Sequence, residues 1–186
     1  EDFIKNEGSI FRDMRYVGVP GVDNLNQIAP GIVADFPKLA GSAAHVFGRP
    51  MVWDEDGGGT GRSGKFIIDY QYVRGINYPN IRGLNGAAPA AGAIYDSAAA
   101  AGWYAGRAGF LLQMGRPAAQ VALYHPTDSM WLGDQEADTV DKKLTTELMD
   151  RQIDFDHIDA DSLAEVCTLE GGGLKNLSGQ VYHAVI

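Results

Sequence analysis

Strands and helices alternate through the last third of the chain, and this alternation constrains the fold more than any other sequence feature. Short apolar runs bounded by turn residues predict strands, whereas apolar residues at helical spacing predict helices. We expect strands at residues 119–124, 153–158 and 181–186, and helices at residues 139–152 and 162–166. Strands that are joined through helices lie parallel in one sheet, so this pattern predicts an open α/β fold.

The first part of the chain shows the same alternation. Helices are expected at residues 36–47, which Gly48 ends, and at residues 65–74. Strands are expected at residues 50–53 and 76–81. Polar residues follow both strands, at the edge of a parallel sheet where α/β enzymes place their chemistry.

A tract of small residues divides the chain in two. Residues 83–93 are rich in Ala and Gly with one Pro, which suits a linker, and a helix over residues 98–114 follows them. We therefore expect one domain over residues 1–100 and another over residues 101–186. The first carries 9 basic and 11 acidic side chains, and the second carries 6 basic and 13 acidic ones.

Composition excludes several classes of function. The formal net charge is −9 and the sequence has no basic run, which argues against nucleic acid as a partner. No stretch approaches the roughly 20 apolar residues that span a bilayer. The single cysteine, Cys167, rules out a Cys-rich zinc motif. The first residue is Glu1 and the last expected strand ends at Ile186, so we expect a piece of a longer polypeptide.

The acidic residues Asp54, Glu55 and Asp56 come at the end of the strand expected at residues 50–53. A carboxylate in that position can act as a general base or nucleophile, because a rigid strand holds it over a cleft; the alternative is a solvated acidic turn. Glycosidases use two carboxyl groups. Asp54 and Glu55 point to opposite faces of a strand, so the second would be Asp23 or lie outside this chain.

A phosphate-binding loop is a competing interpretation of the next residues. The stretch from Gly59 to Lys65 fits G-x-x-x-x-G-K between an expected strand and an expected helix. Phe66 stands where such a loop has Ser or Thr, and the carboxylates just upstream would repel phosphate. Nucleotide binding is therefore the weaker hypothesis.

Other polar residues have ordinary explanations. We expect His45 to be a packed, hydrogen-bonded histidine, and Asn80 and Arg82 either to contact a polar substrate or to keep a loop soluble. The remaining histidines, His125, His157 and His183, lack metal-ligand spacing. Two further groups of residues lie in the helix expected at residues 139–152 and in the segment just before it. We expect an apolar face made by Val140, Leu144, Leu148 and Met149, and a solvated acidic start made by Asp134, Glu136, Asp138 and Asp141.

Several phrases of the sequence resemble glycoside hydrolase family 106, the α-L-rhamnosidase-like enzymes. The first is a Lys-Ser-Ala-Ala-His-Gly-Pro pattern followed by a glutamate, formed here by Lys38, Ser42, Ala43, Ala44, His45, Gly48, Pro50 and Glu55. Asp69 with residues 75–77 is similar to a second phrase of that family. Residues 121–126 and 152–159 are similar to phrases that follow its catalytic barrel.

The resemblance implies a fold and an activity. The fold is α/β, the closing portion of a (β/α)8 barrel followed by a truncated flavodoxin-like (amidotransferase-like) parallel-sheet domain. Glu55 falls on the family's carboxylate at a strand end, which implies a base that activates water in inverting hydrolysis of an α-L-rhamnoside. Asp54, Asn80 and Arg82 would lie near the sugar, and the general acid would come from upstream.

The resemblance also implies calcium dependence, without identifying ligands in this chain, and secretion or a periplasmic location. The expected partners are a carbohydrate substrate and the remainder of the polypeptide. A non-catalytic α/β module for ligand capture or assembly is the alternative. A solvent-facing Glu55 without a cleft would favour that alternative.

Overall fold

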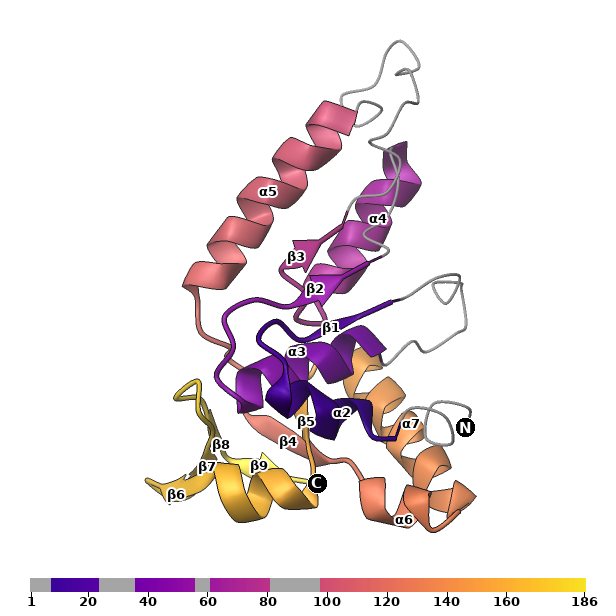
Figure 1. Ribbon diagram of the computed structural model, residues 1–186, viewed down its shortest axis with the longest axis vertical. Helices are drawn as coiled ribbons and strands as arrows, with labels where there is room; N and C mark the ends of the chain where they lie inside the picture. The colour runs from indigo at the N-terminus through magenta and orange to yellow at the C-terminus, as the bar shows by residue number, and fades with distance from the viewer. Residues whose placement is uncertain (1–7, 24–35, 56–60, 81–97) are drawn as a thin grey trace.

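The computed structural model describes residues 8–23, 36–55, 61–80 and 98–186 (Figure 1). These residues form a mixed α/β structure with two parallel three-stranded sheets and one antiparallel three-stranded sheet. An α/β architecture with parallel sheets therefore confirms the expectation from the alternating pattern. Among the described helices, none combines the length and apolar character that a bilayer crossing requires.

Three consecutive β/α units build the first sheet. Its strands β1 (Gly21–Val22), β2 (Trp53–Asp54) and β3 (Tyr78–Pro79) are parallel neighbours in chain order. The helices α3 (Phe36–Val46), α4 (Gly61–Tyr72) and α5 (Ala98–Met114) each follow one of these strands. The helices expected at residues 36–47 and 98–114 are confirmed, whereas α4 starts four residues before the helix expected at residues 65–74.

The second sheet has the order β5-β4-β9 and is parallel throughout. β4 (Val121–Tyr124) is central, between β5 (Phe155–Ile158) and β9 (Ala184–Val185). The crossover from β4 to β5 contains α6 (Thr127–Trp131) and α7 (Gln135–Asp150). The strands expected at residues 119–124 and 153–158 are thereby confirmed, although both are shorter than expected.

The third sheet is antiparallel, and the sequence pattern did not predict it. It comprises β6 (Thr168–Glu170), β7 (Gly173–Lys175) and β8 (Val181–Tyr182) and follows the π-helical turn η2 (Ser162–Val166). Gly171 and Gly172 join β6 to β7 with φ of 59° and 81°, a left-handed conformation that suits glycine. The single strand expected at residues 181–186 is wrong, because β8 and β9 belong to different sheets.

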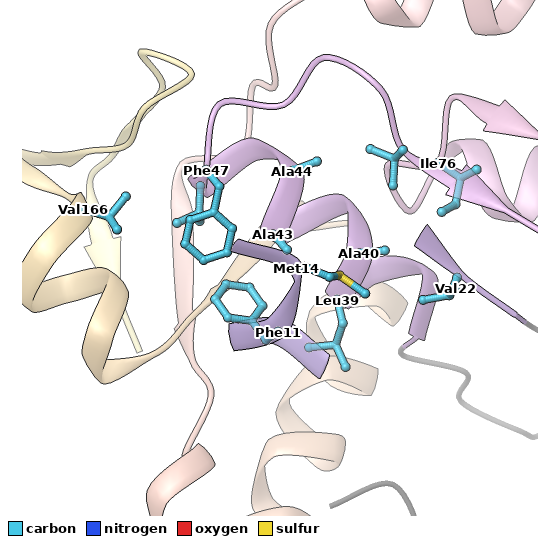
Figure 2. Packing of buried hydrophobic residues seen from close by; sticks show 12 residues of the cluster. Phe11, Met14, Val22, Leu39, Ala40, Ala43, Ala44, Phe47, Ile76 and Val166 are labelled. Atoms are coloured by element: carbon cyan, nitrogen blue, oxygen red, sulfur yellow. The ribbon is translucent and has the colours of Figure 1, made fainter. Parts of the chain in front are cut away.

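Helix α3 lies between the first and second sheets (Figure 1) and is buried on nearly all sides. It begins beside β1, packs along β5, and contributes much of the largest apolar cluster (Figure 2). Its small residues Ala40, Ala43 and Ala44 are fully buried. The rings of Phe11 and Phe47 close this cluster with centroids 5.5 Å apart. The Ala-rich sequence of α3 therefore serves close packing on both sides.

Two helix contacts are so close that they require glycine. In α3, a Cβ on Gly41 would lie 2.4 Å from the carbonyl oxygen of Arg74, in the turn that follows α4. In α5, a Cβ on Gly109 would lie 2.5 Å from the carbonyl oxygen of Asn77, just before β3. Both neighbours are backbone atoms, which cannot move aside as a side chain can. These glycines therefore set how closely α3 approaches the turn after α4 and how closely α5 approaches the segment before β3.

Helix α5 packs with the first part of the chain. It contacts α4 and β3, and the hydroxyl of Tyr72 donates a 2.6 Å hydrogen bond to the carbonyl oxygen of Ala105. The boundary expected between residues 100 and 101 falls inside this helix, and the second sheet starts after Met114. The buried face consists of small residues, whereas several large apolar side chains are exposed. The exposed ones are Trp103, Phe110, Leu111, Leu112 and Met114.

The buried face of α7 also differs from the expected one. Val140 is exposed, while Asp141, Thr145 and Leu148 are buried. Asp134 caps the helix, and its carboxylate accepts hydrogen bonds from the backbone N–H groups of Glu136 and Ala137. The expectation that Asp141 belongs to a solvated acidic start is therefore wrong, because this residue faces the sheet.

Candidate active site

Three polar residues form a row at the carboxyl edge of the first sheet. The register pairs Val22 with Asp54, so Asp23, Glu55 and Asn80 each follow the last paired residue of their strand. The Glu55 N–H donates to the carbonyl oxygen of Val22 at 3.0 Å, and the Asn80 N–H donates to that of Asp54 at 2.8 Å. The ladder thus continues through this row and fixes the backbone of Glu55 beside that of Asp23, on strands about 4.8 Å apart.

Asp54 lies beneath this row. Its side chain is fully buried, and one carboxylate oxygen accepts a 2.7 Å hydrogen bond from the Gln71 amide of α4. Successive residues of a strand point to opposite faces, so Asp54 faces the helix layer and Glu55 faces the other side of the sheet. This burial argues against Asp54 as a direct sugar contact and makes it a residue that holds β2 against α4.

Buried polar contacts also fix the segments that lead into β2 and β3. The side chain of Asn77 accepts a 2.9 Å hydrogen bond from the Val52 N–H and donates one of 2.9 Å to the carbonyl oxygen of Pro50. Val52 and Ile76 are buried beside it in the main apolar cluster. The backbone that carries the carboxylate one residue beyond β2 is therefore rigidly held. Catalysis requires such support for a positioned general base.

Several expected site residues lie outside the described part of the chain. Arg82, expected near the sugar, is among them, and so are Asp56, Gly59 and Thr60. Glu55 is partly exposed and Asn80 is exposed, so both side chains are accessible at the edge. The structure therefore brings Asp23, Glu55 and Asn80 to one edge, and the part that Arg82 plays stays a prediction.

The geometry of α4 gives little support to a phosphate-binding loop. Helix α4 begins at Gly61, so five of the seven motif residues are helical. Lys65, the residue that would reach phosphate, pairs with Asp69 one turn along and donates to the Tyr104 hydroxyl at 3.3 Å. The Asp69 hydrogen bond raises the pKa of Lys65 and likewise raises that of Tyr104. The lysine is thus held in a local cluster between α4 and α5.

A cavity of about 620 Å³ lies at the opposite end of the first sheet. Its walls include residues just before β2 and β3, together with Lys38, His45, Arg49 and Arg116. The amino-terminal ends of parallel strands usually serve stability, whereas the carboxyl ends carry catalysis. The chemistry expected of Glu55 therefore lies away from this cavity.

The second sheet brings together residues that sequence reasoning kept apart. His125, Asp141 and His157 meet behind β4 and β5, although the histidines were expected to be scattered. His183 is exposed and stands outside this group. The positions of these residues along the chain could have indicated the cluster. His125 follows one strand, His157 lies in the next, and the helix between them carries Asp141.

Comparison with known proteins adds a likeness of fold. No protein-family model matches the chain, and no curated protein matches it. The solved structure of a rhamnosidase from Novosphingobium sp. PP1Y is similar, with 20% sequence identity and a TM-score of 0.62. The match covers 94% of this chain and 19% of the rhamnosidase chain. The chain thus has the fold of a part of that larger protein.

Proposed function

We propose that this chain is part of a glycoside hydrolase that removes a terminal sugar, an α-L-rhamnoside, by inverting acid/base hydrolysis. The observation that carries the proposal is the position of Glu55, accessible and one residue beyond β2 at the carboxyl edge of a parallel sheet. The likeness to part of a rhamnosidase supports the choice of sugar.

In the proposed mechanism Glu55 acts as the general base. Its carboxylate takes a proton from a water molecule, whose oxygen attacks the anomeric carbon opposite the leaving group. A second carboxylic acid protonates the leaving oxygen, so that the C–O bond breaks with inversion. Asp23 lies beside Glu55 in the register, and the remainder of the polypeptide is the other source of this acid.

The neighbours of Glu55 have separate parts in the proposal. Asn80 and Arg82 contact the sugar, while Asp54 acts as a positioning residue through Gln71. Calcium, which the family resemblance implies, requires oxygen ligands. Asn80 could offer an amide oxygen at this edge, and the other ligands would come from the remainder of the polypeptide, because calcium takes about six to eight oxygens. Bound there, calcium would supply positive charge to polarise sugar hydroxyls.

The remainder of the polypeptide is the proposed partner of this chain. The similar rhamnosidase is much longer, since the chain spans 19% of it. Large apolar side chains of α5, among them Trp103 and Phe110, are exposed in this chain. Such exposure is expected where another segment of a longer polypeptide covers them. We propose that the first sheet is the closing portion of a (β/α)8 barrel and the second belongs to a flavodoxin-like domain that continues beyond Ile186.

The test compares glycosidase activity in the full-length protein. Release of p-nitrophenol is measured from the α-L-rhamnoside and from a panel of other aryl glycosides. Glu55→Gln keeps the side-chain size and removes the base, so we expect kcat to fall by about 100-fold or more on whichever glycoside is cleaved. Glu170→Gln, on the exposed β6–β7 hairpin, is the matched control and should retain activity.

Each other outcome changes the proposal in a defined way. Equal loss in both variants would point to a general defect of folding, which circular dichroism detects. An active Glu55→Gln variant would keep the hydrolase and remove Glu55 from its site. No turnover of any glycoside would favour the non-catalytic module, for which binding of the same sugars is then measured by calorimetry.

A further inference from the structure

Three potential metal ligands converge behind the second sheet, far in sequence from Glu55. His125 follows β4, His157 is the third residue of β5, and Asp141 lies in the second turn of α7. Each residue offers a ligand atom, and these atoms all lie within 4.8 Å of one another. The crossover from β4 through α7 to β5 therefore assembles two imidazoles and one carboxylate.

The contacts inside the cluster leave part of its bonding capacity unused. Nδ1 of His125 is 3.1 Å from one carboxylate oxygen of Asp141. The other carboxylate oxygen lies 3.7 Å from Nδ1 of His157, which is beyond hydrogen-bond length. The Asp141 carboxylate thus lies between two imidazole rings but is within hydrogen-bond distance of the His125 ring only.

These missing hydrogen bonds matter because the side chains concerned are buried. The side chains of His157 and Thr145 have no exposed surface, and Asp141 is 3% exposed. Both ring nitrogens of His157, Oδ1 of Asp141 and Oγ1 of Thr145 lack a hydrogen-bond partner among the described residues. Native proteins satisfy almost all buried polar atoms, so the unpartnered atoms of His157 and Asp141, which meet in this cluster, indicate a bound ion or water.

The walls of the cluster are rigid and largely aromatic. The ring of His157 meets the edges of Phe155 and His125 at centroid distances of 5.3 Å and 5.4 Å. The backbone N–H of His157 donates a 2.9 Å hydrogen bond to the Ser42 hydroxyl of α3, which holds β5 in place. The cluster is therefore pre-organised, with His125 as its partly exposed side.

We propose that His125, Asp141 and His157 bind a divalent transition-metal ion of the zinc type, which fastens α7 to the second sheet. Imidazole nitrogen with carboxylate oxygen suits zinc and its neighbours rather than calcium, which takes oxygen ligands. Zinc–ligand bonds of about 2.0–2.2 Å place ligand atoms roughly 3–4 Å apart, which small side-chain rotations reach from the observed spacing. Water would complete four-coordination. The proposal does not rest on the proposed function.

The first test uses the wild-type protein, stripped with a chelator and titrated with Zn²⁺ alone by calorimetry. We expect one tightly bound ion per chain and a higher melting temperature on loading. X-ray absorption of the zinc-loaded protein should show two imidazole ligands with oxygen completing the shell. No binding, or a shell without two imidazoles, overturns the proposal and leaves water as the occupant.

The second test identifies the residues that bind the ion. His125→Gln and Asp141→Asn should each weaken Zn²⁺ binding by more than about 100-fold, because changes to second-shell groups alone cost about 10–100-fold. His183→Gln alters an exposed histidine outside the cluster and should bind as wild type does. Circular dichroism of the metal-free variants checks their fold. Wild-type affinity in both folded cluster variants would show that the metal binds elsewhere and overturn the site.

Discussion

Nδ1 of His45 lies 2.8 Å from a carboxylate oxygen of Asp156, although 111 residues separate them in sequence. The same two segments also meet through the Lys38 ammonium, 2.7 Å from Asp154, and through the Ser42 hydroxyl, which binds the backbone of β5. The segments over residues 36–50 and 152–159 are therefore the two sides of one contact. Their polar residues fasten α3 to the second sheet.

The contact between His45 and Asp156 should contribute measurably to the stability of the fold. Burial alone would raise the pKa of Asp156, but the charge and hydrogen bond of His45, with Lys38 and Tyr182, outweigh it and lower that pKa to about 2. His45→Ala removes one partner of a buried carboxylate, so we expect the free energy of unfolding in urea to fall by about 2 kcal/mol. His183→Ala, at an exposed site, should change it by less than about 0.5 kcal/mol. Equal effects would refute this role.

Two glycines of α5 should respond to alanine with opposite signs. A Cβ at position 109 meets the backbone oxygen of Asn77, so Gly109→Ala should destabilise the protein by about 1–3 kcal/mol. A Cβ at position 106 meets no atom within 4 Å, and alanine favours the helix, so Gly106→Ala should stabilise it by about 0.5–1 kcal/mol. Thermal unfolding of both variants checks the pair. A stabilising Gly109→Ala would contradict the close packing of α5.

The amide of Gln71 should matter to β2. Gln71→Met removes the donor of the 2.7 Å hydrogen bond to the buried Asp54, so we expect a loss of about 2 kcal/mol in unfolding free energy. If the proposed hydrolysis holds, kcat should fall as well, because Glu55 is the next residue. The control is Gln120→Met, since Gln120 is exposed just before β4. Wild-type stability in Gln71→Met would show that this contact does not hold the strand.

The only cysteine should react slowly with alkylating reagents. Burial, with a smaller contribution from the negative charge of Asp159, raises the pKa of Cys167 from 9.0 to about 11. The thiolate is the reactive form, so at pH 8 its fraction is about 100-fold below that of an unperturbed thiol. The iodoacetamide rate should rise about tenfold per pH unit up to pH 11, while the protein stays folded. A plateau near pH 9 would contradict the shift.

The exposed apolar face of α5 should drive self-association of the isolated chain. Replacing Phe110 and Leu111 together by Gln removes two large apolar groups from the surface without opening a cavity. We expect sedimentation to shift toward the monomer, with unfolding free energy changed by less than about 1 kcal/mol. Unchanged sedimentation of a self-associating chain would exclude this face as the contact.

Sequence reasoning succeeded where local signals and tertiary packing agree. Helix α3 was expected almost as found, because Gly48 ends it with φ of 69° and its small residues suit burial. It failed at α7, where hydrophobic periodicity selects Val140 and the sheet instead receives Asp141 and Thr145. A pattern of apolar residues cannot reveal a buried polar face.

The candidate sites divide in the same way. The position of Glu55 at a strand end followed from the apolar run before it, since register then determines its neighbours. The burial of Asp54 depends on Gln71, a contact between a strand and the next helix that spacing does not show. The meeting of His125 with His157 depends on which strands pair, and strand pairing is a property of the whole sheet.

Because α3 is buried against both sheets, the two halves of this chain should melt in one cooperative transition. Dissecting the chain between Met114 and Val121 would expose on one fragment the helix surface that β5 covers, and on the other the buried Asp156 that His45 partners. Neither fragment would then fold independently, whereas limited proteolysis there should leave a nicked complex that stays together. The unit of folding is thus larger than either parallel sheet.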